Sequence, residues 1–68
     1  MAKQPRSPSY QLTYEDAIVV HEKIAEGWLQ SRIAAFFDVN GGRISEVNTG
    51  LLHPGSYDDF VRYRSKAA

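Results

Sequence analysis

The sequence contains no cysteine, which excludes disulfide bonds, thiolate catalysis and cysteine metal sites together. Small secreted domains usually rely on such cross-links, so their absence favours the cytoplasm. Long apolar runs are also missing, since residues 17–20 and 33–37 fall far short of the roughly 20 residues in a membrane span. Residues 1–8 are polar and contain proline, unlike a signal peptide. We therefore expect a cytoplasmic protein without membrane contact.

The chain has no excess of either charge, because eight Lys and Arg residues balance eight Asp and Glu residues. Nucleic-acid modules are more often basic, since neutralising phosphates supplies much of their affinity. Four of the eight acidic residues lie between 15 and 26, whereas most arginines come later. Acidic groups can therefore lie away from a DNA-binding face. We expect one copy of the chain to bind DNA weakly.

The residue types of an active site are scarce. The two histidines are far apart, and neither a glycine-rich phosphate loop nor a pair of carboxylates in a pocket can be recognised. The sequence therefore predicts no enzyme activity, no cofactor, no metal site and no small-molecule ligand.

The chain has 68 residues, of which 43% are hydrophobic. This length and composition fit one small globular domain. The pattern predicts an all-α fold, a three- to four-helix bundle over residues 12–66. Residues 1–11 have little to bury and predict a flexible N-terminal arm. Lys3 and Arg6 of this arm could reach a DNA groove, although a solvated tail is the favoured interpretation.

The first helix is predicted to begin after Thr13, a good N-cap, with Asp16 as the acid of a capping box. Apolar residues recur behind it at helical spacing from Ala17 to Trp28, and Gly27 ends or bends the helix. His21 lies within this apolar arc. We interpret it as a buried, hydrogen-bonded core residue rather than a metal ligand or a pH switch.

Residues 30–49 predict two short amphipathic helices joined by a tight link. Ile33, Ala34 and Phe37 share one face of the first helix, and Ile44 and Val47 share one face of the second, with Leu51 beyond it. Helices this short cannot bury themselves alone, so they must cross and pack on the first helix. Ala34 is small where the helices cross, Val39 fills the corner, and Asn40 caps the second helix.

This segment resembles the helix-turn-helix superfamily of bacterial and phage regulators, of the repressor and resolvase types. The resemblance rests on Gln30, Ala34 and the apolar core positions, and Ile44-Ser45-Glu46-Val47 is similar to the recognition helix of lactose-family repressors. That family usually has glycine where Asp38 stands, and Asp can adopt the left-handed conformation at some cost. The resemblance implies that the second helix of the motif enters the major groove of double-stranded DNA.

Within that geometry, Arg43 is the leading candidate for reading a base, because guanidinium can pair with guanine in bidentate fashion. It could equally hold a phosphate. Glu46 is interpreted as a cytosine acceptor, a surface charge or an Arg43 partner. Gly41 and Gly42 indicate either a close approach to DNA or a frayed first turn. The predicted DNA-binding residues are Gln30, Ser31, Arg32, Asn40, Gly41, Gly42, Arg43, Ser45, Glu46 and Thr49.

A turn at Pro54-Gly55 precedes a short helix predicted over about residues 57–64, with Ser56 as its N-cap. This helix either covers the motif or makes a dimer contact. Two copies would supply the contacts that one motif lacks, and Phe36 lies off the core face, so a homodimer is an expected partner.

The leading hypothesis is a small prokaryotic or phage transcription regulator that binds DNA sequence-specifically and is associated with the nucleoid. Two alternatives remain open: a protein-binding adaptor on the same scaffold, and an excisionase-like recombination accessory factor.

Overall fold

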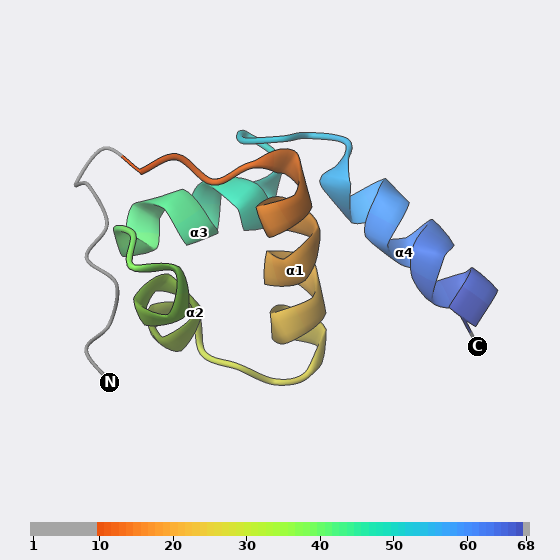
Figure 1. Cartoon of the computed structure of the whole chain (residues 1–68), viewed down its shortest axis with the longest axis horizontal. Helices are drawn as coiled ribbons and strands as arrows, with labels where there is room; N and C mark the ends of the chain where they lie inside the picture. Colours follow the sequence, from red (N-terminus) through yellow and green to blue (C-terminus); the bar gives the residue numbers. More distant parts are fainter. Residues whose placement is uncertain (1–9, 68) are drawn as a thin grey trace.

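The computed structural model describes the backbone of residues 10–67 and the side chains of residues 10–64. Four helices follow one another, α1 (Tyr14–Ala25), α2 (Gln30–Phe37), α3 (Gly41–Thr49) and α4 (Ser56–Ala67), and the described residues form no strand. Helices α1, α2 and α3 surround the core, while α4 lies beyond α1 at the other end of the long axis (Figure 1). The prediction of a small all-α bundle is confirmed.

Helix α1 begins where the sequence predicts. The Thr13 side chain accepts from the Asp16 amide at 3.0 Å, and the Asp16 carboxylate accepts from the Thr13 amide at 3.0 Å, which completes a capping box. The core-facing side of α1 carries Ala17 and Val20, both fully buried. These contacts fix the helix against which the other three pack.

Helices α2 and α3 cross steeply, since α2 is seen almost end-on in Figure 1 while α3 runs across the view. Ile33, Ala34 and Phe37 of α2 meet Ile44 and Val47 of α3 in the core, and Val39 packs against this cluster from the link. The two short helices and their contact through a small residue agree with the prediction.

Left-handed residues end the helices. Asp38 follows α2 with φ 61° and ψ 45°, and the next amide, that of Val39, donates to the Ala34 carbonyl at 2.9 Å. This is a Schellman arrangement with Asp in the usual glycine position. Gly50 (φ 86°) ends α3 in the same way, with the Leu51 amide donating to the Glu46 carbonyl at 2.9 Å.

The N-terminal half of α4 is held against α1 by polar and aromatic groups. His21 is 4% exposed, and its Nε2 lies 3.0 Å from Oγ of the fully buried Ser56. The His21 ring also contacts the rings of Tyr57 and Phe60. Burial lowers the pKa of His21 below its ordinary value. His21 is therefore the hydrogen-bonded core residue that the sequence predicts.

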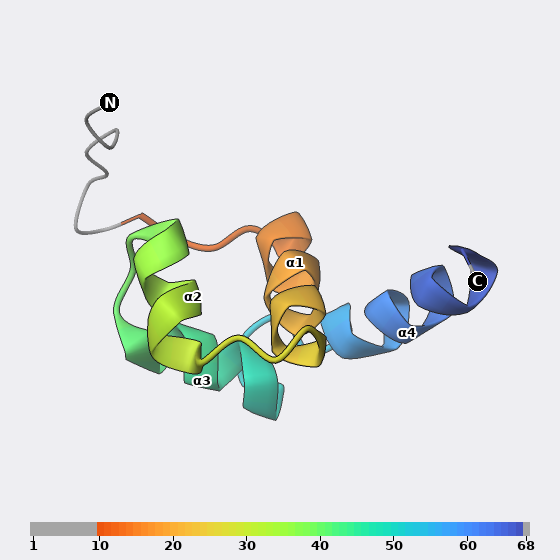
Figure 2. The same ribbon diagram turned by 90° about the horizontal axis from the view of Figure 1, so that it is seen from below.

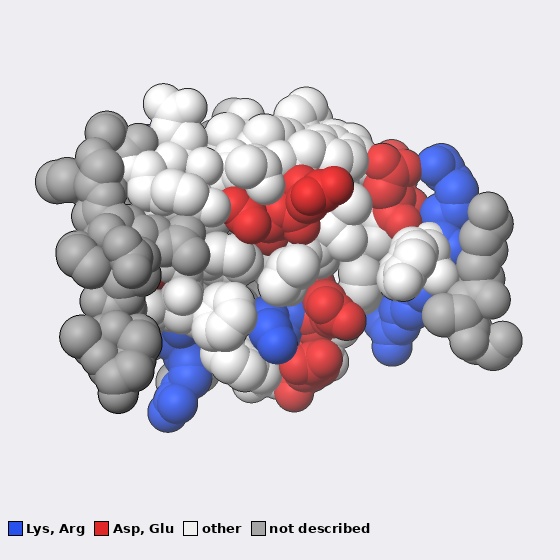
Figure 3. Space-filling model, in the orientation of Figure 1, with Lys and Arg blue, Asp and Glu red and all other residues white. Residues whose placement is uncertain are grey.

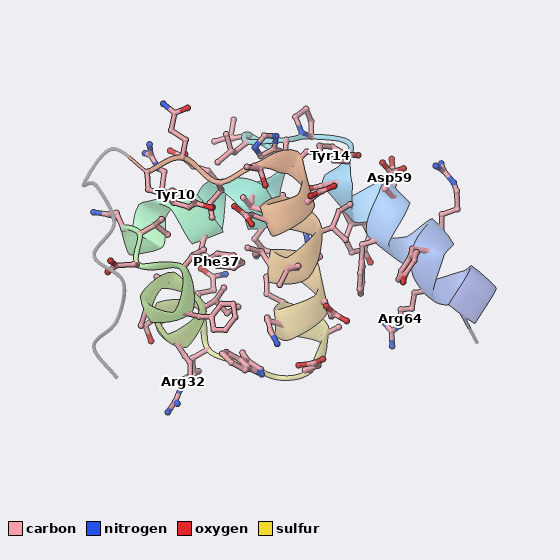
Figure 4. All side chains as sticks on the ribbon, viewed as in Figure 1. Tyr10, Tyr14, Arg32, Phe37, Asp59 and Arg64 are labelled. Carbon is pink, nitrogen blue, oxygen red and sulfur yellow. The ribbon has the colours of Figure 1, made fainter. Side chains whose placement is uncertain are left out.

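A second contact joins α1 and α4 near their N-terminal ends. The Tyr14 hydroxyl donates to the Asp59 carboxylate, and the two side chains point toward one another in Figure 4. This hydrogen bond, followed by burial and the negative charge of Asp59, raises the pKa of the Tyr14 phenol.

The structure differs from the sequence predictions at α4 and at Leu51. Helix α4 spans Ser56–Ala67 rather than about residues 57–64. Ser56 is its first residue rather than its N-cap, because the Gly55 carbonyl already accepts from the Asp59 amide at 3.2 Å, and the Ser56 hydroxyl bonds to His21 instead. Leu51 is 79% exposed and not part of the core, since the reversal at Gly50 leaves Leu52 to pack inward instead.

The predicted arm lies mostly outside the described residues, including Lys3 and Arg6. Near its end, Tyr10 packs against the core, and Leu12, just after the predicted arm, is 4% exposed. Within residues 10–67, none of the helices has the length and apolar character needed to cross a bilayer.

Candidate nucleic-acid interface

Helix α3 buries one side and turns the other outward. Ile44 and Val47 are 0% and 1% exposed, so the helical repeat turns the opposite side of α3 away from the core. That outer side carries small and polar residues, Gly42, Ser45, Glu46 and Thr49, of which all but the partly buried Glu46 are exposed. A helix with a short-chained outer side can approach another surface closely along its length.

The first turn of α3 is capped and open. The Asn40 side chain accepts from the Gly42 amide at 2.7 Å, which confirms Asn40 as the N-cap. Among the described residues, no atom lies within 4 Å of the place that a Cβ on Gly41 would occupy, whereas one on Gly42 would lie 3.2 Å from Asn40 Oδ1. Packing among these residues therefore gives no reason for glycine at position 41.

Arg43 and Glu46 form an ion pair one turn apart on α3. Arg43 Nη2 lies 3.0 Å from Glu46 Oε2, and the two side chains are 52% and 36% exposed. An exposed pair of this kind contributes little to stability. Its larger effect is on the surface potential, because Glu46 offsets the charge of Arg43 on the outer side of α3.

The N-terminal end of α2 is the second part of the candidate surface. Gln30, Ser31 and Arg32 are exposed, and Leu29, in the N-cap position, makes no side-chain cap. Figure 4 shows Arg32 pointing into solvent. In Figure 2 this end of α2 and the whole of α3 lie toward the same side of the molecule. The fold thus brings the two predicted groups of residues together on one side.

The acidic residues of α1 lie on a different side. Figure 3 shows the face on which acidic side chains gather over α1, and α3 lies behind this face in the same orientation (Figure 1). Helix α1 contains the acidic residues Glu15, Asp16 and Glu22, and its C-cap residue is Glu26. The acidic side chains of α1 therefore lie away from the outer side of α3, where Glu46 is the acidic residue among the described ones.

A groove that the sequence did not predict runs beside Arg43. It lies between the start of the described chain, the α2–α3 link and the segment after α3, and His53 closes it by bonding through Nε2 to the Leu12 carbonyl at 2.7 Å. The spacing of 41 residues between these two groups leaves no signal in the sequence. His53 thus joins the segment just before α1 to the segment after α3.

Asn48 is a further exposed polar residue of α3 that the prediction omitted. It lies at the edge of the outer side, three residues after Ser45, and helical periodicity alone could have found it. In residues 10–67 no three His, Cys, Asp or Glu side chains come together in a way that could hold a metal ion.

Comparison with protein-family models, with curated proteins and with solved structures gave no match to this chain.

Proposed function

We propose that this chain binds double-stranded DNA sequence-specifically, with α3 in the major groove, and acts as a small transcription regulator. Arg43, Ser45 and Thr49 face base edges and phosphates, and the amides at the start of α2 hold a phosphate. The proposal rests on the resemblance of residues 30–49 to helix-turn-helix regulators and on the surface that this segment presents.

One observation carries the proposal. The outer side of α3 combines short polar side chains with an arginine at its edge, and the acidic residues of α1 lie on another side of the molecule. A helix that must enter a groove about 12 Å wide needs a slim outer side, and phosphates repel carboxylates. The first requirement is met along α3, and the second is met by the acidic residues of α1, whereas Glu46 is a carboxylate on the outer side of α3 that pairs with Arg43.

The test is an NMR titration of ¹⁵N-labelled protein with duplex DNA of mixed sequence at low salt. We expect shift changes concentrated in residues 30–49 and weakening steeply as salt is added, because phosphate contacts release counterions. An unchanged spectrum at low salt would refute DNA binding. Selection of bound duplexes from a random pool would then give the target sequence.

A matched pair of variants assigns the contacts. Arg43→Ala should weaken binding by roughly 1–3 kcal/mol and relax base preference at one position. Glu46→Gln should strengthen binding, because it frees Arg43 and removes a negative charge from the outer side of α3. If both variants bind as the wild type does at every salt concentration, α3 is not the contact surface.

A second candidate, protein binding, is favoured by apolar groups beside α2. Leu29 and Phe36 are 71% and 53% exposed, and Phe36 contacts the half-buried Trp28 edge to face. Lys23 lies over both rings. Exposed aromatic groups of this kind are common in protein interfaces. If NMR shift changes occur at these residues when a partner protein is added, and none occur when DNA is added, the chain is an adaptor.

A further inference from the structure

An apolar groove runs between α1 and α4. Two adjoining clefts form it, with volumes of about 570 and 270 Å³, and both are lined by Ile18 of α1 and Tyr63 of α4. Tyr63 is 71% exposed, and Ile18 is half-buried. Ala25 and Phe60 line the second cleft from the two helices. Apolar groups of both helices therefore remain open to solvent along one line.

The groove has the length and the walls that suit a helix. Its α1 wall is one stripe at helical spacing, made of Glu15, Ile18, Glu22, Ala25 and Glu26. At about 1.5 Å per residue this stripe is about 16 Å long, or about three turns. Towards its C-terminal end α4 diverges from α1 in both ribbon views (Figures 1 and 2). A third helix can therefore lie between the two walls, as amphipathic helices do in apolar grooves.

Two carboxylates on the α1 wall are available to a partner. Glu15 and Glu22 are exposed, and neither forms an ion pair with another residue that the structure describes. On the α4 wall, by contrast, Arg62 Nη1 lies 2.8 Å from Asp59 Oδ1, so these two charges offset each other. Figure 3 shows mainly acidic side chains over α1. A partner gains attraction if the flank that it turns toward α1 is cationic, and an acidic flank is repelled.

Arg64 is the cation that such a partner meets on the α4 wall. Its guanidinium lies over the Phe60 ring, 5.5 Å from the ring centre, and the side chain is exposed. An exposed cation–π contact is weak. An apolar side chain that enters the groove can therefore take the place of Arg64 over Phe60, while the arginine turns into solvent.

We propose that the groove between α1 and α4 binds an amphipathic helix of another protein. The apolar stripe of that helix packs against Ile18 and Tyr63, and lysine or arginine side chains along one flank face Glu15 and Glu22. The inference goes beyond the proposed function, since the contact involves neither DNA nor α3. Helix α3 lies behind the acidic face of α1 (Figures 1 and 3), so a partner in the groove leaves α3 uncovered.

An NMR titration of the ¹⁵N-labelled full chain with a synthetic peptide tests the proposal. The peptide has about 18 residues, long enough to form a helix in water, with leucines on one side, lysines along one flank, and alanine and glutamine elsewhere. We expect saturable shift changes in α1 and α4 and none on the outer side of α3. A peptide with glutamates in place of the lysines should bind about tenfold more weakly or not at all, because the carboxylates of α1 repel it. A scrambled lysine peptide without an apolar side should also fail to bind.

Three variants locate the contact. Tyr63→Ala should weaken binding of the lysine peptide by about tenfold or more, because it removes the exposed aromatic wall of the groove. Glu22→Gln should weaken binding by about two- to fivefold, as the loss of one exposed ion pair does. The matched control is Glu46→Gln, which removes the same charge from α3 and should leave peptide binding unchanged. Circular dichroism should show that every variant is folded.

The proposal is overturned if the lysine peptide causes no saturable shift changes, if the glutamate or scrambled peptide binds equally well, or if Tyr63→Ala binds as the wild type does. Equal weakening by Glu46→Gln and Glu22→Gln would overturn it too. If the groove resonances shift with protein concentration when no peptide is present, the occupant is a second copy of the chain, and the proposal is wrong. DNA titrations report separately on the proposed function, so either proposal can fail alone.

Discussion

Helix α3 and helix α4 are attached to the same small core by different chemistry. Helix α3 is held by the buried aliphatic residues Ile44 and Val47, packed against α2 and α1. Helix α4 places Ser56 and Phe60 against α1, and a histidine–serine hydrogen bond lies at the centre of that contact. Towards its C-terminal end α4 diverges from α1 in both ribbon views (Figures 1 and 2), and Tyr63 and Arg64 line an open groove between the two helices.

This difference predicts two levels of stability within one domain. Aliphatic burial contributes about 25 cal/mol per Å² without directional requirements, whereas a buried hydrogen bond stabilises only while both partners are present and correctly protonated. We therefore expect α4 to open before α1, α2 and α3 do, as a local unfolding unit.

The largest effect is expected at the aliphatic contact. Ile44→Ala removes a fully buried side chain and leaves a cavity between α1, α2 and α3, so the free energy of unfolding should fall by about 2–5 kcal/mol. Urea unfolding followed by circular dichroism measures this loss. The control is Leu51→Ala, at an exposed position next to the same helix, which should change stability by less than about 0.5 kcal/mol. Equal losses in the two variants would contradict the described core.

A smaller and more local effect is expected at the polar contact. Ser56→Ala leaves the buried His21 Nε2 without its partner, which should cost about 1–3 kcal/mol. Native-state hydrogen exchange should show the loss first in the amides of α4, with those of α2 and α3 little affected. Ser45→Ala, which removes a hydroxyl exposed to solvent, serves as the control. Uniformly faster exchange in all four helices would show that α4 is not a separate unit.

Acid should weaken the same contact. Burial lowers the pKa of His21 in the folded chain below its ordinary value of 6.5, so the unfolded chain binds the proton more readily. The stability that neutral His21 supports is therefore present above pH 6.5 and is lost as pH falls through this value toward the lowered pKa. Unfolding measured from pH 7.5 to 5 should show this loss. His21→Gln should be much less sensitive over that range, and an unchanged pH dependence would refute the assignment.

The sequence predicted the α2–α3 region because its signals are local. Apolar residues at spacings of three and four, Asn40 as a cap and Asp38 as a tolerable left-handed residue all act within 20 residues. Each corresponds to a feature of the described structure. Local propensity and tertiary packing agree here, so no long-range knowledge was needed.

The contacts of α4 and of the segment before it could not be predicted in the same way. His21 meets Ser56 across 35 residues, and His53 meets the Leu12 carbonyl across 41. A serine before two acids has the pattern of an N-cap, and only the tertiary fold assigns its hydroxyl to a histidine instead. Whether exposed residues of α2 and α3 bind DNA depends on the partner as well as on the fold, so the DNA-binding residues stay predictions.

The smallest expected effect is that of a substitution at Gly41, which should change the stability of the fold and the affinity for DNA in opposite directions. Gly41→Ala puts a methyl group into open space at a negative φ, so it should raise the free energy of unfolding by about 0.5–1 kcal/mol through the entropy of the unfolded chain. If the backbone at Gly41 approaches DNA closely, the same methyl group should weaken DNA binding. Opposite signs in the melting temperature and in the affinity would assign the glycine to the interface. A gain in stability with unchanged affinity would instead mean that Gly41 only leaves the first turn frayed.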